Sequence, residues 1–125
     1  MSLSRIVMRL ARNPGTEFAD GDDHRGYALI APLTPDGHLD EAAFRSAKAN
    51  CTVRRFAPDE DPQEGRLAKR GDRWFFDYDS AKTANPDDEP VYRLGQHSFA
   101  VGEYVSVTDE DGRLLTYKVT EVASV

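Results

Sequence analysis

Hydrophobic and polar residues alternate most clearly in the last third of the chain, between His97 and Val122. Because successive side chains of a β-strand point to opposite faces, this alternation predicts strands with one apolar and one polar face. The Asp-Gly pair at 111–112 lies between two such runs and is typical of a β-hairpin turn. The apolar face of the predicted hairpin carries Val101, Val105, Val107, Leu115, Tyr117 and Val119. Its polar face carries Tyr104, Ser106, Thr108, Thr116, Lys118 and Thr120.

The N-terminal segment, residues 3–12, fits two interpretations. Ile6, Met8 and Leu10 alternate with basic residues as in a strand, whereas helical spacing also fits the apolar positions up to a stop at 13–15. We favour an edge strand, because the clear elements elsewhere are β and an edge strand needs charges against aggregation. Further strands are predicted at 26–33, 51–56, 65–69, 73–78 and 91–94, of which 65–69 and 73–78 form a second hairpin.

One helix is predicted, over residues 41–50. Asp40 suits its N-cap, and Glu41 lies in the first turn, where the helix dipole favours an acid. Four alanines in this segment are good helix formers, and we expect the helix to pack across one end of the sheet through Phe44. In contrast, residues 57–62 and 79–90 are acidic and contain prolines, so we expect irregular loops there.

Together these elements predict a single domain over residues 1–125. The length suits one domain, and no internal repeat or long linker divides the chain. Six or seven short strands with one helix favour a mainly β, β-rich α+β fold: a small antiparallel, partly closed β-barrel. An open antiparallel sheet with the helix on one face is the alternative.

The composition narrows the functional classes. With 22 acidic against 16 basic residues, the net charge of -6 opposes a general affinity for nucleic acid. A single cysteine, Cys51, excludes an internal disulfide and favours a reducing compartment. Arg9 and Arg12 interrupt the apolar N-terminal stretch, so we expect no signal peptide, and no later stretch is long enough to span a membrane. We therefore expect a cytoplasmic protein without membrane contact.

No catalytic, cofactor or metal motif stands out in the chain. The three histidines and Cys51 lack the spacing of zinc ligands, and the acidic runs at Asp20 and Asp77 do not fit an EF-hand loop. We therefore expect no metal and no cofactor, and we interpret Cys51 as a small buried hydrophobe. Trp74, Phe76 and Tyr78 share one face of a strand; we expect a core face there, rather than a stacking platform for nucleic-acid bases.

Several short blocks look like those of small uncharacterised bacterial proteins. The resemblance extends over much of the chain and implies a bacterial protein, but it implies no activity, cofactor or functional residue. The blocks are Arg9–Arg12, Gly26-Tyr27 with Ala31–Leu33, Gly37–Asp40, Asp77–Asp79 and Tyr92–His97. The run from Val101 to Val107 is also similar to a Gly-Asp-x-Val strand of small binding barrels.

The absence of a catalytic constellation favours a small non-catalytic binding or adaptor module. Its partner would be a protein or a small polar ligand, and the oligomeric state stays open. The candidate contact residues are Tyr27, Arg66, Arg93 and His97. One alternative is a small enzyme that pairs His97 or His38 with a loop carboxylate. Another is a single-stranded nucleic-acid binder with its arginines on one face.

Overall fold

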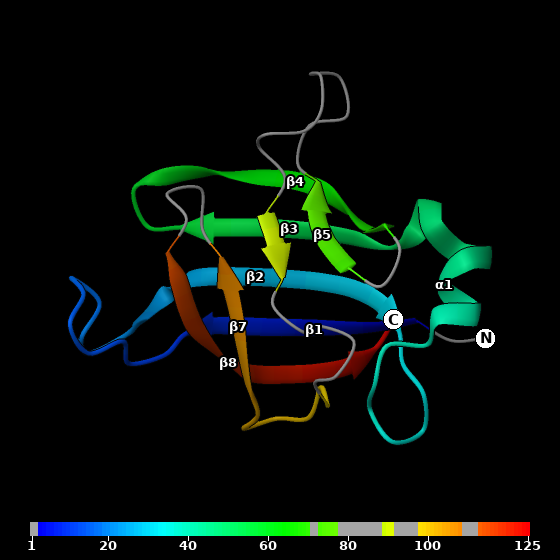
Figure 1. Ribbon diagram of the computed structural model, residues 1–125, viewed down its shortest axis with the longest axis horizontal. Coiled ribbons are helices and arrows are strands. Elements are labelled where there is room, and N and C mark those ends of the chain that lie inside the picture. Colours follow the sequence, from blue (N-terminus) through cyan, green and yellow to red (C-terminus); the bar gives the residue numbers. More distant parts are fainter. Residues whose placement is uncertain (1–2, 71–72, 78–88, 92–97, 109–112) are drawn as a thin grey trace.

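The computed structural model describes residues 3–70, 73–77, 89–91, 98–108 and 113–125 (Figure 1). Within these ranges the chain forms eight strands, one α-helix and one 3-10 turn. The strands are β1 (Leu3–Leu10), β2 (Asp22–Pro32), β3 (Thr52–Ala57), β4 (Glu60–Arg70), β5 (Arg73–Asp77), β6 (Glu89–Val91), β7 (Tyr104–Thr108) and β8 (Leu114–Ser124). The helix α1 spans Glu41–Ala47, and the 3-10 turn η1 spans Lys48–Asn50.

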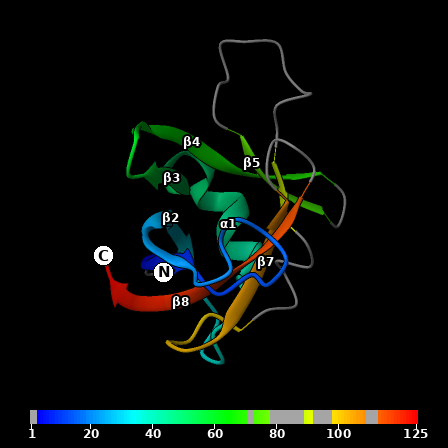
Figure 2. The same ribbon diagram turned by 90° about the vertical axis from the view of Figure 1, so that its left-hand side faces the viewer.

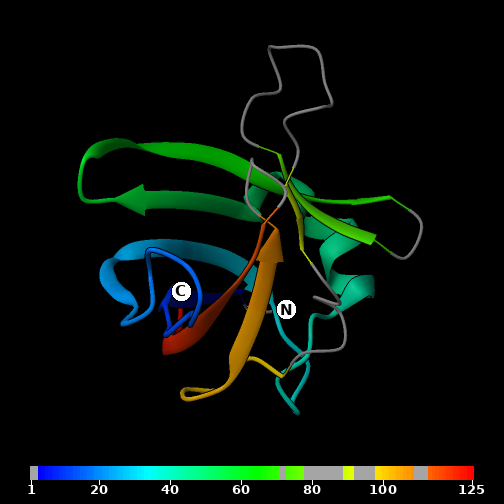
Figure 3. The same cartoon turned by 60° about the vertical axis from the view of Figure 1, so that its left-hand side comes forward.

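The strands form a small antiparallel barrel in which each strand pairs with the next in sequence. β8 returns to pair with β1 and closes the order. In Figures 1 and 3, β7 crosses the direction of the longer strands β1 to β4. Between β6 and β7, the described residues in register are Val91 and Val107. The predicted β-rich fold, a curled and partly closed antiparallel sheet with one helix, is confirmed.

The N-terminal segment is a strand, as favoured, but it is not an edge strand. β1 pairs with β2 on one side and with β8 on the other, so that Ile6 lies opposite both Leu29 and Val122. The arginines of β1 therefore alternate with its interior side chains instead of protecting a free edge. The approach of β2 is so close at Gly26 that a Cβ atom there would lie 1.9 Å from the carbonyl oxygen of Met8.

Aromatic side chains fill the barrel interior. The ring of Tyr27 lies 5.0 Å, between centroids, from the rings of both Phe76 and Tyr117. Trp74 and Phe76 are buried, which confirms the predicted core face of their strand and leaves neither ring exposed for base stacking; Tyr78 lies outside the described residues. An eight-stranded barrel is just wide enough for side chains to fill it. Cys51 is buried in this core, as expected.

The predicted irregular loop at 57–62 is wrong. β3 continues to Ala57, a tight turn follows, and β4 begins at Glu60 and includes Pro62. Proline lacks the backbone N–H group that would donate to a neighbouring strand, so it is tolerated in a strand only at a sheet edge, at the first residue or at a bulge. Among the described strands, β5 pairs with β4 only from Arg66 onward, so the preceding half of β4 has β3 as its one neighbour.

The helix begins at Glu41, directly after the predicted N-cap residue Asp40. Asp40 Oδ1 accepts a hydrogen bond from the backbone N–H of Ala43 at 3.1 Å. Phe44 is buried and its ring meets that of Trp74 edge-on, 4.9 Å between centroids. The α-helix is shorter than expected, because its last turn tightens into η1. It packs across one end of the barrel, as predicted (Figure 1).

The predicted C-terminal hairpin is formed by β7 and β8, with Val107 opposite Leu115 and Tyr104 opposite Lys118. Its apolar face is buried at Val105, Val107, Leu115, Tyr117 and Val119. Val101 differs: it precedes β7 and its side chain is 66% exposed. The predicted turn at 111–112 and most of the predicted loop at 79–90 lie outside the described residues. Of the predicted strand at 91–94, Val91 belongs to β6, which begins at Glu89 within the predicted loop; residues 92–94 lie outside the described residues.

Candidate functional site at the loop end of the barrel

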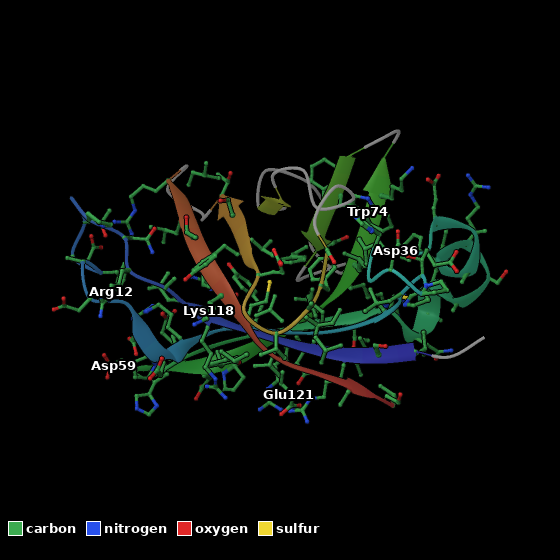
Figure 4. The ribbon with its side chains drawn as sticks, turned by 90° about the horizontal axis from the view of Figure 1, so that it is seen from below. Arg12, Asp36, Asp59, Trp74, Lys118 and Glu121 are labelled. Carbon is green, nitrogen blue, oxygen red and sulfur yellow. The ribbon has the colours of Figure 1, made fainter. Side chains whose placement is uncertain are left out.

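The two ends of the barrel are closed by different chemistry. At one end, the buried side chains of Leu39, Phe44 and Ala47 join the core. The other end is crossed by the loop between β1 and β2, residues 11–21, and Figure 2 looks onto it. In Figure 4, Arg12 and Asp59 lie at this loop end, whereas Asp36 and Trp74 lie toward α1. Because side chains fill the interior, the loop end is where polar groups can meet a ligand.

Asn13 fastens the loop to β8. It is 8% exposed, and its side-chain amide donates to the carbonyls of Ala11 and Thr116 at 2.8 and 3.1 Å. Its Oδ1 accepts from the Thr116 N–H at 2.9 Å. The carbonyl of Phe18 accepts from the backbone N–H groups of Asn13 and Gly21. These bonds hold Phe18 where its half-buried ring packs against the core.

Two arginines lie against the Phe18 ring. The guanidinium of Arg25, on β2, is 4.8 Å from the ring centroid, and that of Arg113, just before β8, is 5.8 Å from it. Cations are attracted to the face of an aromatic ring, more strongly where water is excluded. Carboxylates surround the pair, and we call the whole group the loop-end cluster: Glu17, Phe18, Asp22, Arg25, Glu60 and Arg113.

Arg25 is the most buried cation of the loop-end cluster, with a side chain 22% exposed. Its Nε is fully buried and has no hydrogen-bond partner among the described residues. Asp22 Oδ2 lies 3.6 Å from Nε, and Glu60 Oε2 lies 3.7 Å from Nη1. Both distances exceed those of an N–H···O hydrogen bond. The two carboxylates therefore balance the charge of Arg25 without satisfying its Nε–H group.

Arg113 makes a much tighter pair. Its Nη1 donates to both carboxylate oxygens of Glu17, at 2.8 and 2.7 Å. This hydrogen bonding is the main reason why the pKa of Glu17 lies below its ordinary value. Glu17 is therefore ionised at neutral pH and holds the loop against the start of β8.

Of the four predicted contact residues, Tyr27 and Arg66 belong to the described part of the chain, and the structure does not bring these two together. Tyr27 is 1% exposed and belongs to the core, two residues beyond Arg25 on β2. Arg66 is exposed on β4, with Thr52 and Asp77 as its neighbours in register. Tyr27 and Arg66 thus share no surface. Arg93 and His97 lie outside the described residues.

The sequence interpretation missed Phe18, Arg25 and Arg113. Phe18 and Arg25 precede the predicted strand at 26–33, and Arg113 directly follows the predicted turn at 111–112. A lone arginine at the start of a strand is usually exposed, and no local pattern marks it as buried. In the structure, Arg25 lies in the irregular stretch of β2, between Asp22, which pairs with Leu10, and Gly26, which pairs with Arg9.

His38 lies near a carboxylate, as the enzyme alternative requires. Its Nδ1 is 3.4 Å from Asp36 Oδ2, with the two side chains 38% and 75% exposed. Asp36 also accepts a hydrogen bond from the hydroxyl of Thr34, and this bond is the main reason why the pKa of Asp36 is lowered. The backbone closes the same turn, since Thr34 N–H donates to the His38 carbonyl at 2.7 Å. These contacts belong to an exposed turn and hold the side chains of Asp36 and His38 in place.

Other chemistry finds little support in the described parts of the chain. There, no three His, Cys, Asp or Glu side chains are grouped so that they could hold a metal ion. Burial raises the pKa of the Cys51 thiol, which disfavours the reactive thiolate. No helix within the described ranges is both long and apolar enough to cross a membrane.

Comparison of the chain with known proteins identified no related protein. No protein-family model matches the chain, and neither does any curated protein or solved structure. The resemblance to small bacterial proteins therefore stays a prediction, and the geometry of the loop-end cluster is the basis for a functional proposal.

Proposed function

We propose that this protein is a small non-catalytic binding module whose loop-end cluster takes a small polar ligand through an oxygen atom. The observation that carries the proposal is the buried Nε–H group of Arg25, which no described residue accepts. The arginine is held in place from two sides, by Phe18 and by the carboxylates of Asp22 and Glu60. Its donor is therefore oriented before a ligand arrives.

The energetics favour an external acceptor. A buried donor without a partner costs about 1–3 kcal/mol, and a hydrogen bond to a charged group stabilises by about 1.5–3 kcal/mol. A ligand oxygen that displaces the side chains covering Nε would remove the first and add the second. The planar guanidinium also restricts the direction of approach, which a flexible ammonium group would not. Binding at Arg25 thus combines affinity with orientation.

The test is a titration followed at the arginine side chains. Acetamide and acetate, two small probes with oxygen acceptors, are added to ¹⁵N-labelled protein while the Nε–Hε resonances are recorded. We expect at least one probe to shift the Arg25 resonance in a saturable way. If neither probe moves it, the proposed function is wrong.

Variants locate the binding. Arg25→Lys keeps the charge but removes the Nε–H group, so we expect probe binding, followed at the backbone amides of residues 17–25, to be lost. Arg54→Gln is the matched control, because Arg54 is exposed on β3 and its Nε lies 3.8 Å from Glu64 Oε1. It should bind as the wild type does. Equal binding by wild type and Arg25→Lys would remove Arg25 from the site.

The enzyme alternative has one supporting observation, the contact between His38 and Asp36. A general base needs a proton donor within hydrogen-bond reach and a correctly placed substrate. Hydrolysis of p-nitrophenyl acetate tests it. A rate above that of free imidazole, lost in His38→Asn, would favour the enzyme over the binding module; equal rates for the two proteins would dismiss it.

A further inference from the structure

We propose that the ligand group recognised at the loop end is an uncharged amide, which accepts from Arg25 and donates to Glu60. This inference rests on the proposed function and specifies its ligand class. It starts from the charges of the loop-end cluster, where two arginines face three carboxylates. The cluster therefore has an excess of one negative charge, and the whole chain carries -6.

An anionic ligand would meet repulsion at this place. Asp22 and Glu60 already lie 3.6 and 3.7 Å from Arg25. A third carboxylate would have to approach the same guanidinium beside both of them, and like charges at short range disfavour binding. A neutral acceptor such as an amide oxygen satisfies the Nε–H group of Arg25 without that repulsion.

The carboxylate of Glu60 supplies the complementary half of the site. Glu60 is the first residue of β4, next to the turn that carries Asp59 (Figure 4). Its side chain is 51% exposed, so an incoming N–H group can reach it from solvent. Asp22 is less suited, because its Oδ1 already accepts from the backbone N–H of His24 at 2.9 Å.

Glu60 lies beside the guanidinium whose Nε–H group the amide oxygen would meet. Its Oε2 is 3.7 Å from Arg25 Nη1, so the two charged groups attract each other but form no direct hydrogen bond. An amide carries an acceptor and a donor on adjacent atoms, so one group can bond to the cation and the anion together. The Phe18 ring, 4.8 Å from the guanidinium, offers an apolar surface for the rest of the ligand.

Three probes of similar size separate the possibilities. Acetamide carries both acceptor and donor, N,N-dimethylacetamide keeps the acceptor alone, and acetate is a charged acceptor. We expect acetamide to bind about tenfold more tightly than N,N-dimethylacetamide, which lacks the hydrogen bond to a charged carboxylate. Acetate should bind more weakly than acetamide. The measurement is the dissociation constant from the shift of the Arg25 Nε–Hε resonance.

Variants of the carboxylate identify the donor contact. In Glu60→Gln, the amide side chain is a weaker acceptor than a carboxylate, so the preference for acetamide over N,N-dimethylacetamide should fall severalfold. Glu64→Gln is the matched control, since Glu64 is exposed on the same strand and pairs with Arg54. It should keep the full preference, although it removes the same charge.

The outcomes separate the two levels of the proposal. If acetate binds as tightly as acetamide, or if the two amides bind equally, the amide inference is overturned while the binding function of Arg25 stands. If the preference survives in Glu60→Gln, the donor contact is not at Glu60 and the inference fails. If no probe shifts the Arg25 resonance, the proposed function itself fails.

Discussion

At the scale of single residues, Glu17 and Arg113 show how the loop end is held. Their bidentate pair joins the β1–β2 loop to the start of β8, across 96 positions of sequence. Phe18 follows Glu17 directly, so the ion pair and the ring are positioned by the same short segment. The hydrogen bond from Arg113 holds the pKa of Glu17 down, which links this contact to pH.

The pKa of Glu17 is therefore a direct measure of the contact. A carboxyl whose pKa is lowered on folding stabilises the fold above its unfolded pKa, and that stabilisation is lost as the pH falls through the folded pKa. We expect Arg113→Gln to raise the pKa of Glu17 toward its ordinary 4.5 and to remove this part of the acid dependence. A carboxyl-carbon NMR titration checks it. Arg5→Gln, which breaks the exposed pair with Glu121, should leave Glu17 unchanged.

At the scale of elements, the start of α1 was predicted correctly, whereas the first half of β4 was predicted as a loop. The difference has a physical reason. The helix has a local cap, since Asp40 and the Ala43 N–H group are only three positions apart. β4 has no comparable local signal, because prolines and acids are typical of loops. Only its pairing with β3 makes Glu60 and Pro62 part of a strand.

The cap of α1 gives a prediction at this scale. Asp40→Ala should lower the free energy of unfolding by about 1 kcal/mol, because the Ala43 N–H group loses its acceptor. Asp40→Asn retains a side-chain oxygen that can cap the helix, so its loss of unfolding free energy should be only a fraction of the loss in Asp40→Ala. Urea unfolding of both variants checks it. Equal losses would mean that the charge, and not the hydrogen bond, supports the helix.

At the scale of the whole molecule, the described elements are secured unevenly. β1 pairs along its length with β2 and with β8, which joins distant parts of the sequence. In contrast, η1 follows the short helix α1 and has no buried residue. Local stability follows the amount of hydrogen-bonded and buried structure, so η1 should open before β1.

Native-state hydrogen exchange tests this difference. The amides of η1 should exchange by local opening, with little dependence on denaturant. Those of β1 and of β8, including Ile6 and Val119, should exchange only with global unfolding. Equal protection of both groups would show that the barrel opens as one unit.

Much of the fold followed from local pattern. Alternation of side chains over a few residues predicted the hairpin of β7 and β8, the hairpin of β4 and β5, and the aromatic core face of β5. Cap chemistry predicted where the helix begins. The position of β1 did not, because its arginines suit an edge strand as well as the outer face of a closed barrel. Its second neighbour, β8, lies at the other end of the chain.

The sequence by itself determined a small antiparallel β domain with one capped helix, because alternation and capping act between near neighbours. The tertiary structure alone decided where a ligand can meet the chain. Closing the barrel places Phe18, Arg25, Glu60 and Arg113 at one end, although none of them belongs to a motif. Burial of one guanidinium by three separate segments depends on strand register and loop path, and those are set by long-range packing.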